Sequence, residues 1–194
     1  MAKRGPYEKG EAKRREVLLA ALEIFATEGY RGTSLRKVAA RCDLSLAGLM
    51  HYFASKEDML TQVLRMRDEA ANTPRTAEHS VQDHLATIRN NSSTPGLVEL
   101  FVSMAAAAGD PEHPAHAFYA ERYPVVREHA ARLLQTAMDE GRMSTAVPAD
   151  RAAVMLLSVA DGVQLQWLVD RSIDMEQPIV DALALLGYRA GEAN

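Results

Sequence analysis

Four side chains that could bind a metal ion lie close together in the segment Asp110-Pro111-Glu112-His113-Pro114-Ala115-His116. Carboxylates and imidazoles are ordinary ligands of zinc. The two imidazoles would have to meet on one helical turn, and Pro114 interrupts that turn. We therefore interpret the segment as a loop that starts a helix and expect no metal ion. A metal site is the second interpretation.

The rest of the chain shows no set of residues arranged for catalysis. It lacks a nucleophile with a base and an orienting partner, and it lacks a Gly-rich loop that could cradle a phosphate. Cys42 is the single cysteine, which excludes an internal disulfide and a metal site built from several cysteines. We expect a protein that is not an enzyme and has no cofactor.

Charge is distributed unevenly along the 194 residues. Residues 1–56 carry eleven Lys and Arg against six Asp and Glu, a net charge of +5, whereas the remainder carries −9. A basic N-terminal part on an acidic body is typical of a head that binds a polyanion, and a merely solvated charged helix is the alternative. The chain has no apolar run of about 20 residues and no secretory signal, so we expect a cytoplasmic protein without a membrane span.

Apolar residues recur at helical spacing, and alternation typical of strands is almost absent, which predicts an all-α fold. Four helices are predicted in the N-terminal part, each with a start or stop signal. Gly29 stops the first, Thr33 caps the second, Ser45 caps the third, and Ser55 to Asp58 form a capping box that opens the fourth. Further helices are predicted at about 81–88, 97–108, 116–140, 148–170 and 177–188. We divide the chain into a basic tail (1–10), a helical head (11–71) and a larger helical body (72–194).

Two short helices, 34–41 and 45–52, are joined by a tight turn in which Asp43 should adopt the left-handed conformation. This arrangement is typical of a helix-turn-helix, whose second helix enters the major groove of DNA while the first crosses the backbone. The sequence therefore predicts a DNA-binding head.

Three segments resemble the N-terminal domain of the tetracycline-repressor (TetR) family: Glu28 to Ala40, Leu44-Ser45, and His51 to Leu60. The resemblance covers roughly residues 12–65. It implies a cytoplasmic homodimer that regulates transcription, with one head per subunit and a helical body that binds a small effector. Asp43 stands where the family usually has Gly, and Met50 where it commonly has Tyr, which puts one contact with the DNA backbone in doubt.

The resemblance also assigns roles on the DNA. Thr33 and Ser34 would meet a phosphate, and Arg36 would read guanine, with a surface salt bridge as its alternative. His51 and Tyr52 would contact a phosphate or a base edge, although a core histidine is possible at His51. The full set expected on DNA is Thr33, Ser34, Arg36, Ser45, Leu46, Ala47, Gly48, His51, Tyr52 and Lys56, in which Leu46, Ala47 and Gly48 offer only apolar contact. Lys3, Arg4, Lys13, Arg14 and Arg15 would add salt-dependent affinity. For the first ten residues, a disordered and merely solvated tail is the alternative.

The stretch from Ala152 to Val169 is apolar nearly all round, which predicts a helix covered on both sides. We expect a second subunit to supply one cover in a four-helix interface, with a buried central helix of a monomer as the alternative. The expected interface residues are Val154, Leu157, Asp161, Leu165, Leu168, Ile179, Leu183 and Leu186.

The expected effector pocket is less specific, because Met and aromatic residues at helical spacing are often plain core. Its candidate residues are Phe101, Met104, Phe118, Tyr119, Tyr123, Met155 and Trp167. The hypothesis that follows is a dimeric repressor released from a palindromic operator in double-stranded DNA by a small-molecule effector. A regulator controlled by a protein partner, or by no ligand, is the alternative, and an all-α enzyme is a third hypothesis.

Overall fold

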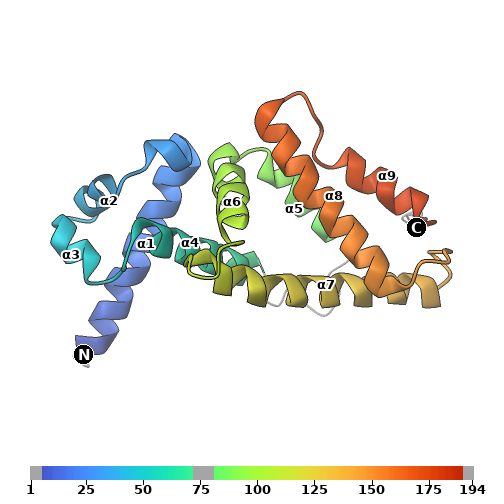
Figure 1. The fold of residues 1–194 in the computed structure, drawn as a ribbon, viewed down its shortest axis with the longest axis horizontal. Coiled ribbons are helices and arrows are strands. Elements are labelled where there is room, and N and C mark those ends of the chain that lie inside the picture. The colour runs from blue at the N-terminus through green and yellow to red at the C-terminus, as the bar shows by residue number, and fades with distance from the viewer. Residues whose placement is uncertain (1–5, 72–80, 190–194) are drawn as a thin grey trace, which may run out of the picture. The chain divides into compact units, whose positions relative to one another are not determined.

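The computed structural model describes residues 6–71 and 81–189. In these residues the chain forms nine helices, and its β-structure is limited to one isolated bridge between Met143 and Tyr188. The helices are α1 (Pro6–Gly32), α2 (Leu35–Arg41), α3 (Leu46–Met50), α4 (Lys56–Ala71), α5 (Val81–Asn91), α6 (Pro95–Ala107), α7 (Ala115–Asp139), α8 (Ala149–Val169) and α9 (Gln177–Leu185) (Figure 1). The predicted all-α fold is confirmed.

The helices belong to two compact units, and the division is not a single cut in the chain. Unit 1 contains residues 1–73 and 94–118, and unit 2 contains residues 74–93 and 119–194. The segment that carries α6 therefore groups with the N-terminal helices. The sequence places the boundary between a DNA-binding head and an effector-binding body at residues 71 and 72. This functional division stays a prediction, and the two compact units do not follow it, because α6 packs with the head.

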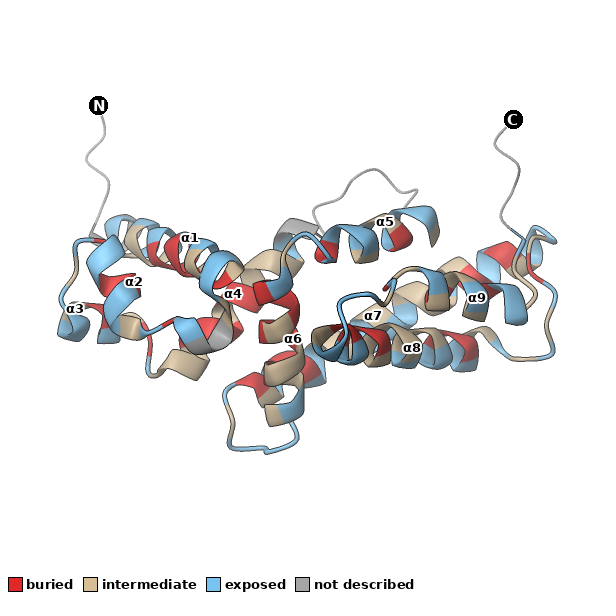
Figure 2. Ribbon diagram, turned by 90° about the horizontal axis from the view of Figure 1, so that it is seen from above, coloured by how far each residue is buried: buried red, intermediate tan, exposed pale blue. Residues whose placement is uncertain are grey.

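Unit 1 is built on α1, which packs against α2, α4 and α6. Val17, Ala21 and Phe25 of α1 are fully buried at a spacing of four residues, so they form one inward stripe (Figure 2). Gly96 at the start of α6 lies so close to α1 that a Cβ there would be 1.9 Å from the carbonyl oxygen of Phe25. This close approach brings the backbones of α1 and α6 together.

The N-terminal helices of unit 1 begin and end much as the sequence predicts. Gly29 has φ 71° and breaks α1, which continues beyond it to Gly32. The Ser55 hydroxyl accepts a hydrogen bond from the Asp58 amide at 3.0 Å, while the Asp58 carboxylate accepts one from the Ala54 amide at 2.8 Å. The predicted capping box at the start of α4 is thus present, with its carboxylate bonded one residue earlier than in the usual box.

The segment considered as a metal site is a loop that leads into α7. The Nδ1 of His113 accepts a hydrogen bond from the Ala115 amide at 3.1 Å, and the Nδ1 of His116 lies 2.9 Å from the Ala108 carbonyl oxygen. Each imidazole is thus engaged with nearby backbone. Among the described residues, no group of three or more His, Cys, Asp or Glu side chains is placed to hold a metal ion.

Unit 2 has its own core, formed where α8 and α9 meet α7 and α5. Nine buried residues make it up: Leu85, Leu134, Ala137, Met143, Ala152, Ala153, Ile179, Leu183 and Leu186. Ile179, Leu183 and Leu186, which the sequence places on a subunit interface, are buried in the core of their own chain instead. Ile179 and Leu183 lie on the inward side of α9, and Leu186 is its C-cap. Apolar periodicity alone does not tell which neighbour covers such residues.

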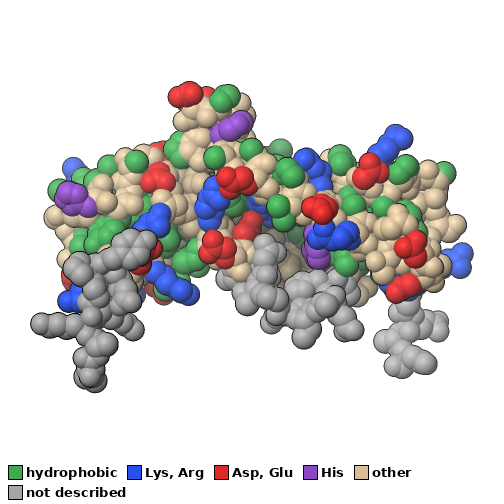
Figure 3. Space-filling model, turned by 90° about the horizontal axis from the view of Figure 1, so that it is seen from below, with side chains coloured by type: hydrophobic (Ala, Val, Ile, Leu, Met, Phe, Trp, Pro, Cys, Tyr) green, Lys and Arg blue, Asp and Glu red, His purple; other side chains and the backbone are tan. Residues whose placement is uncertain are grey.

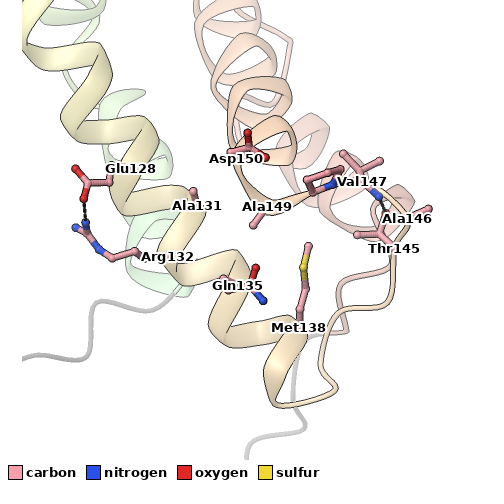
Figure 4. A pocket seen from close by; sticks show the side chains of 11 residues that line it. Glu128, Ala131, Arg132, Gln135, Met138, Thr145, Ala146, Val147, Ala149 and Asp150 are labelled. Atoms are coloured by element: carbon pink, nitrogen blue, oxygen red, sulfur yellow. Dashed lines mark hydrogen bonds and ion pairs between the residues drawn. The ribbon is translucent and has the colours of Figure 1, made fainter.

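Unit 2 also carries an open groove of about 540 Å³ between the end of α7 and the start of α8. An ion pair lies at the groove, with 2.6 Å between a guanidinium nitrogen of Arg132 and a carboxylate oxygen of Glu128. Figure 4 shows this pair, and it shows Met138 near the first residues of α8. This groove is not the pocket expected from the sequence, since none of its lining residues belongs to that set.

Hydrophobic side chains are not confined to the two cores. Figure 3 shows them at the surface among acidic and basic groups on the face that it draws. Within the described residues, one helix, α8, is long and apolar enough to span a membrane by composition alone, and 28% of its most apolar stretch is buried. Its exposed large hydrophobic residues include Val154, Met155, Leu165 and Val169.

Candidate nucleic-acid interface

The turn between α2 and α3 is closed by backbone hydrogen bonds. The Leu44 amide donates to the Ala39 carbonyl at 2.9 Å, and the Asp43 amide donates to the Ala40 carbonyl at 3.3 Å. This pair of bonds is the Schellman pattern, which requires a left-handed residue just after the helix. Asp43 supplies it with φ 55°, as the sequence predicts.

Serine hydroxyls cap both short helices. Ser34 accepts a hydrogen bond from the Lys37 amide at 3.3 Å, and Ser45 accepts one from the Gly48 amide at 3.0 Å. Each bond satisfies an amide that the first helical turn leaves without an intrahelical partner. Both serines belong to the set expected on DNA, and both are exposed.

Thr33 differs from its expected role. It is buried, and its hydroxyl donates to the Gly29 carbonyl at 2.9 Å, so it secures the end of α1. Ser34, one residue later, is the cap of α2. A Thr-Ser pair offers two possible caps one residue apart, and the sequence does not decide between them.

The remaining residues expected on DNA lie at or near the surface of unit 1. Arg36, Ser45, Leu46, Ala47 and His51 are exposed, which also rules out a core histidine at His51. Gly48, Tyr52 and Lys56 are partly exposed. Leu49 and Phe53 fill the inner side of this region. The structure thus brings these residues onto α2, α3 and the segment that follows α3.

Some basic side chains of unit 1 are paired with acidic residues of the same chain, and Arg36 is not. Lys37 pairs with Glu28, and Arg41 lies 3.5 Å from Glu23. Arg36 makes no hydrogen bond or ion pair with any part of the chain that the structure describes. The surface salt bridge considered for Arg36 is therefore not formed, and its guanidinium is available to a ligand.

Lys13 and Arg14 of α1 have a role that local sequence patterns do not reveal. The Lys13 ammonium donates to Glu16 at 2.7 Å and to the Cys42 carbonyl at 2.8 Å, which ties α1 to the turn of the helix-turn-helix. The hydrogen bond to Glu16 raises the pKa of Lys13. Arg14 bonds Gln62 of α4. Both cations are therefore held by contacts within the unit, whereas Lys3 and Arg4 lie outside the described residues.

The residues expected to line an effector pocket divide between the two units. Phe101, Met104 and Phe118 are buried in unit 1, where Arg65 lies 5.5 Å from the centre of the Phe118 ring. Tyr119 and Trp167 are buried in unit 2, and Tyr123 is partly buried there. Met155 is half exposed on α8. A pocket lined by these residues stays a prediction.

A carboxylate lies beside the tyrosines of unit 2. Asp161 of α8 accepts a hydrogen bond from the Tyr123 hydroxyl at 2.8 Å, and the rings of Tyr119 and Tyr123 are 5.7 Å apart. Burial raises the pKa of Asp161, and burial with the bond to Asp161 raises the pKa of Tyr123 to about 12. Asp161 was expected on the subunit interface, and this bond gives it a partner in its own chain.

The N-terminal part of the chain is similar in sequence to known DNA-binding regulators, in agreement with the helix-turn-helix described above. Residues 17–63 match the model of the family described as bacterial regulatory proteins, tetR family. The transcriptional regulator RutR of Escherichia coli is 41% identical over 54 residues, which cover 28% of this chain and 26% of RutR. The family match contains the whole helix-turn-helix, α2 and α3.

Two further similarities extend along most of the chain. The uncharacterized HTH-type regulator YfiR of Bacillus subtilis is 24% identical over 167 residues, 80% of each chain. A crystal structure of a regulator from Saccharomonospora viridis in complex with choline has a TM-score of 0.70 at 19% identity, over 89% of this chain and 94% of that one. The similarity to YfiR thus extends well beyond the head, and the Saccharomonospora viridis structure shows a shared fold. Residues 17–63 of this chain are therefore a helix-turn-helix domain of the tetR family of bacterial regulatory proteins, and the chain is similar to a transcriptional regulator over most of its length.

Proposed function

We propose that the protein is a dimeric repressor that binds a palindromic operator and leaves it when a small molecule binds unit 2. The observation that carries the proposal is the pair of outward surfaces that one chain presents: the exposed residues of α2 and α3, and the exposed apolar face of α8. The first fits DNA, and the second needs a cover that the described part of a single chain does not provide.

The apolar face of α8 favours a second copy as its cover. Val154, Leu165 and Val169 lie on one side of the helix, and Leu165 and Val169 are 55% and 86% exposed. Ser158 and Gly162 lie between them, and a Cβ at Gly162 would meet no atom within 4 Å. Small residues in an apolar face allow two helices to cross closely. Leu185 of α9 is a further exposed apolar side chain of unit 2, at 89%.

A two-fold dimer determines the form of the DNA site. Its recognition helices read successive major grooves when they lie about 34–36 Å apart, or a multiple of that distance. We therefore expect a site with two inverted half-sites. Selection of bound DNA from a random pool, followed by footprinting, tests this proposal. Protection of one asymmetric half-site would contradict it.

The pair Tyr123 and Asp161 is the polar group that we propose for the effector site, next to the ring of Tyr119. A partly buried carboxylate beside aromatic rings suits a ligand with a cationic or hydrogen-bond-donating group. The choline complex of the Saccharomonospora viridis protein supports a small cation as the first probe. We expect choline to raise the melting temperature of the protein and Asp161→Asn to abolish the rise.

Release from DNA requires that the ligand prefer a conformer whose heads do not fit the operator. Near-complete switching takes a preference of roughly 10⁴-fold between the two conformers. If choline binds, it should therefore lower operator affinity in the same titration. Binding without any change in operator affinity would contradict effector-controlled repression and leave DNA binding intact.

Control by a protein partner is the second candidate, and the groove of unit 2 is the observation that favours it. The groove is open at the surface, with Arg132, Gln135 and Asp150 among its lining residues, and so resembles a contact surface more than an enclosed ligand cavity. Binding of small cations at Asp161 would favour the first candidate. Either form of control is consistent with a cytoplasmic protein, which we propose because its target is DNA.

A further inference from the structure

The outward face of α3 is apolar, which is unusual for a helix that meets DNA. Leu46 is 38% exposed, Met50 is 42% exposed, and Ala47 is exposed as well, while Leu49 of the same helix is fully buried. Residues four apart lie next to each other along a helix. Leu46 and Met50 therefore form one continuous apolar surface.

This surface stands out within its unit. Of the exposed large hydrophobic residues in the described part of unit 1, Leu46 and Met50 are on α3, and Leu19 is on α1. At the start of α3, the Ser45 hydroxyl already accepts the capping bond from the Gly48 amide. A Cβ at Gly48 would lie 3.3 Å from that hydroxyl oxygen, so the position next to the cap has little room for a longer side chain.

The major groove offers one apolar group to such a surface. Adenine, guanine and cytosine present donors and acceptors there, and thymine adds its C5-methyl group. A leucine or methionine set against a polar base edge would remove water from donors or acceptors without replacing their hydrogen bonds, which is unfavourable. Set against a methyl group, the same side chain buries apolar area at no such cost.

We propose that Leu46 and Met50 read the C5-methyl groups of thymines, so that each half-site carries thymine where these two side chains face it. The inference rests on the proposed binding mode, in which α3 enters the major groove. It adds what α3 recognises there: the methyl group of the base, in place of its hydrogen-bonding edge. Arg36 on α2 then supplies the polar contact.

Replacement of thymine by deoxyuridine in the selected operator tests the proposal, because it removes the methyl group and leaves the hydrogen-bonding groups unchanged. Each thymine is replaced in turn, and affinity is measured by fluorescence anisotropy. We expect one or two positions per half-site at which affinity falls about three- to tenfold, the effect of one buried methyl group. All other positions should respond little.

Three variants assign the effect to its side chains. Leu46→Ala and Met50→Ala should each lose the preference for thymine over deoxyuridine at one position, with little change in affinity for the substituted operator. Leu19→Ala is the matched control, since Leu19 is 45% exposed on α1 of the same unit, and it should keep the preference. Circular dichroism and melting temperature verify that the variants fold.

Two outcomes would overturn the inference while the proposed DNA-binding mode stands. One is an operator that tolerates deoxyuridine at every thymine. The other is a preference for thymine that persists in both α3 variants, because another group would then contact the methyl. Failure of the unmodified protein to select any DNA sequence would instead refute the proposed function, and the inference with it.

Discussion

Arg36 and Arg15 are two exposed arginines of unit 1 that make no ion pair with the described residues, and they allow base reading to be separated from general attraction to DNA. We expect Arg36→Ala to weaken operator binding by about 1–3 kcal/mol and to relax the preference for guanine at one position. Arg15→Ala should weaken binding equally on all sequences and reduce the salt slope by about 1. Anisotropy titrations at several salt concentrations distinguish the two. A uniform loss in Arg36→Ala would contradict base reading.

The Tyr123–Asp161 pair gives a prediction about pH. Burial raises the pKa of Asp161, so its ionised form is disfavoured in the folded chain, and the stability that its protonated form contributes is lost as pH rises through the folded-state pKa. Tyr123, with a pKa of about 12, stays a donor throughout. Asp161→Asn keeps an acceptor and does not titrate. Its melting temperature relative to the natural protein should therefore rise by about 1–3 °C between pH 3 and pH 7.

Thermal unfolding followed by circular dichroism at a series of pH values measures this difference. Asp181→Asn is the control, because Asp181 is an exposed aspartate of the same unit whose partner, Gln177, is uncharged. A difference between Asp161→Asn and the natural protein that shrinks as pH rises would contradict the prediction.

At the scale of single residues, the sequence predicts positions better than partners. It places Arg36, His51 and Ser45 at the surface of the head, where the structure has them. It does not reveal that Lys13 bonds the carbonyl of Cys42, because the two are 29 residues apart and no local pattern links them. Long-range contacts of this kind depend on how the helices pack.

The packing of α6 on α1 gives a prediction at the scale of elements. A Cβ at Gly96 would lie 1.9 Å from the Phe25 carbonyl oxygen, and both atoms belong to backbone that cannot rotate away. We expect Gly96→Ala to lower the free energy of unfolding by about 1–3 kcal/mol, as for other overpacked contacts. Gly10→Ala, whose Cβ would meet no atom within 4 Å, should be neutral or gain up to about 1 kcal/mol.

Chemical denaturation of the two glycine variants measures both values. Equal stability of Gly96→Ala and the natural protein would show that α1 and α6 can separate without loss. Operator affinity need not change in either variant, because neither glycine lies on α2 or α3.

Helix positions were well predicted because their end signals are local. Ser45, Asp43 and the box at Ser55 each act through bonds to residues within five positions, so the sequence contains the whole signal. The grouping of α6 with the head could not be predicted in this way. It depends on the glycine contact with α1, which joins residues about seventy positions apart.

At the scale of the whole molecule, the apolar pattern of the sequence predicts that other helices cover α8 and α9. It does not tell whether those helices belong to the same chain or to a second subunit. The sequence treats Leu165 and Leu183 alike, yet Leu165 is exposed and Leu183 is buried in the core of unit 2. The exposed fraction of each side chain distinguishes residues buried in the core of one chain from residues that could contact a second copy. The interface that we propose is therefore centred on Val154, Leu165 and Val169 of α8, without the buried residues Ile179, Leu183 and Leu186.

This separation makes the proposed dimer testable with one matched pair of variants. Leu165→Asp places a charge in the centre of the exposed face of α8, and desolvation of that charge should weaken association by at least about thirtyfold. Val125→Asp places the same charge on α7 of the same unit, at a valine that is 61% exposed, and should leave the dimer intact. Because both sites are exposed in one chain, neither variant should lose much stability as a monomer.

Sedimentation velocity over a range of concentrations measures the association of each variant. Titrations with a single half-site and with the full operator then measure the effect on DNA binding. A chain with one head holds one half-site, so Leu165→Asp should bind a single half-site as the natural protein does but lose the added affinity of two linked heads on the full operator. A dimer that survives Leu165→Asp would move the interface away from α8. Dissociation by Val125→Asp as well would mean that the charge acts through general repulsion, so that the apolar face of α8 would no longer be needed to explain assembly.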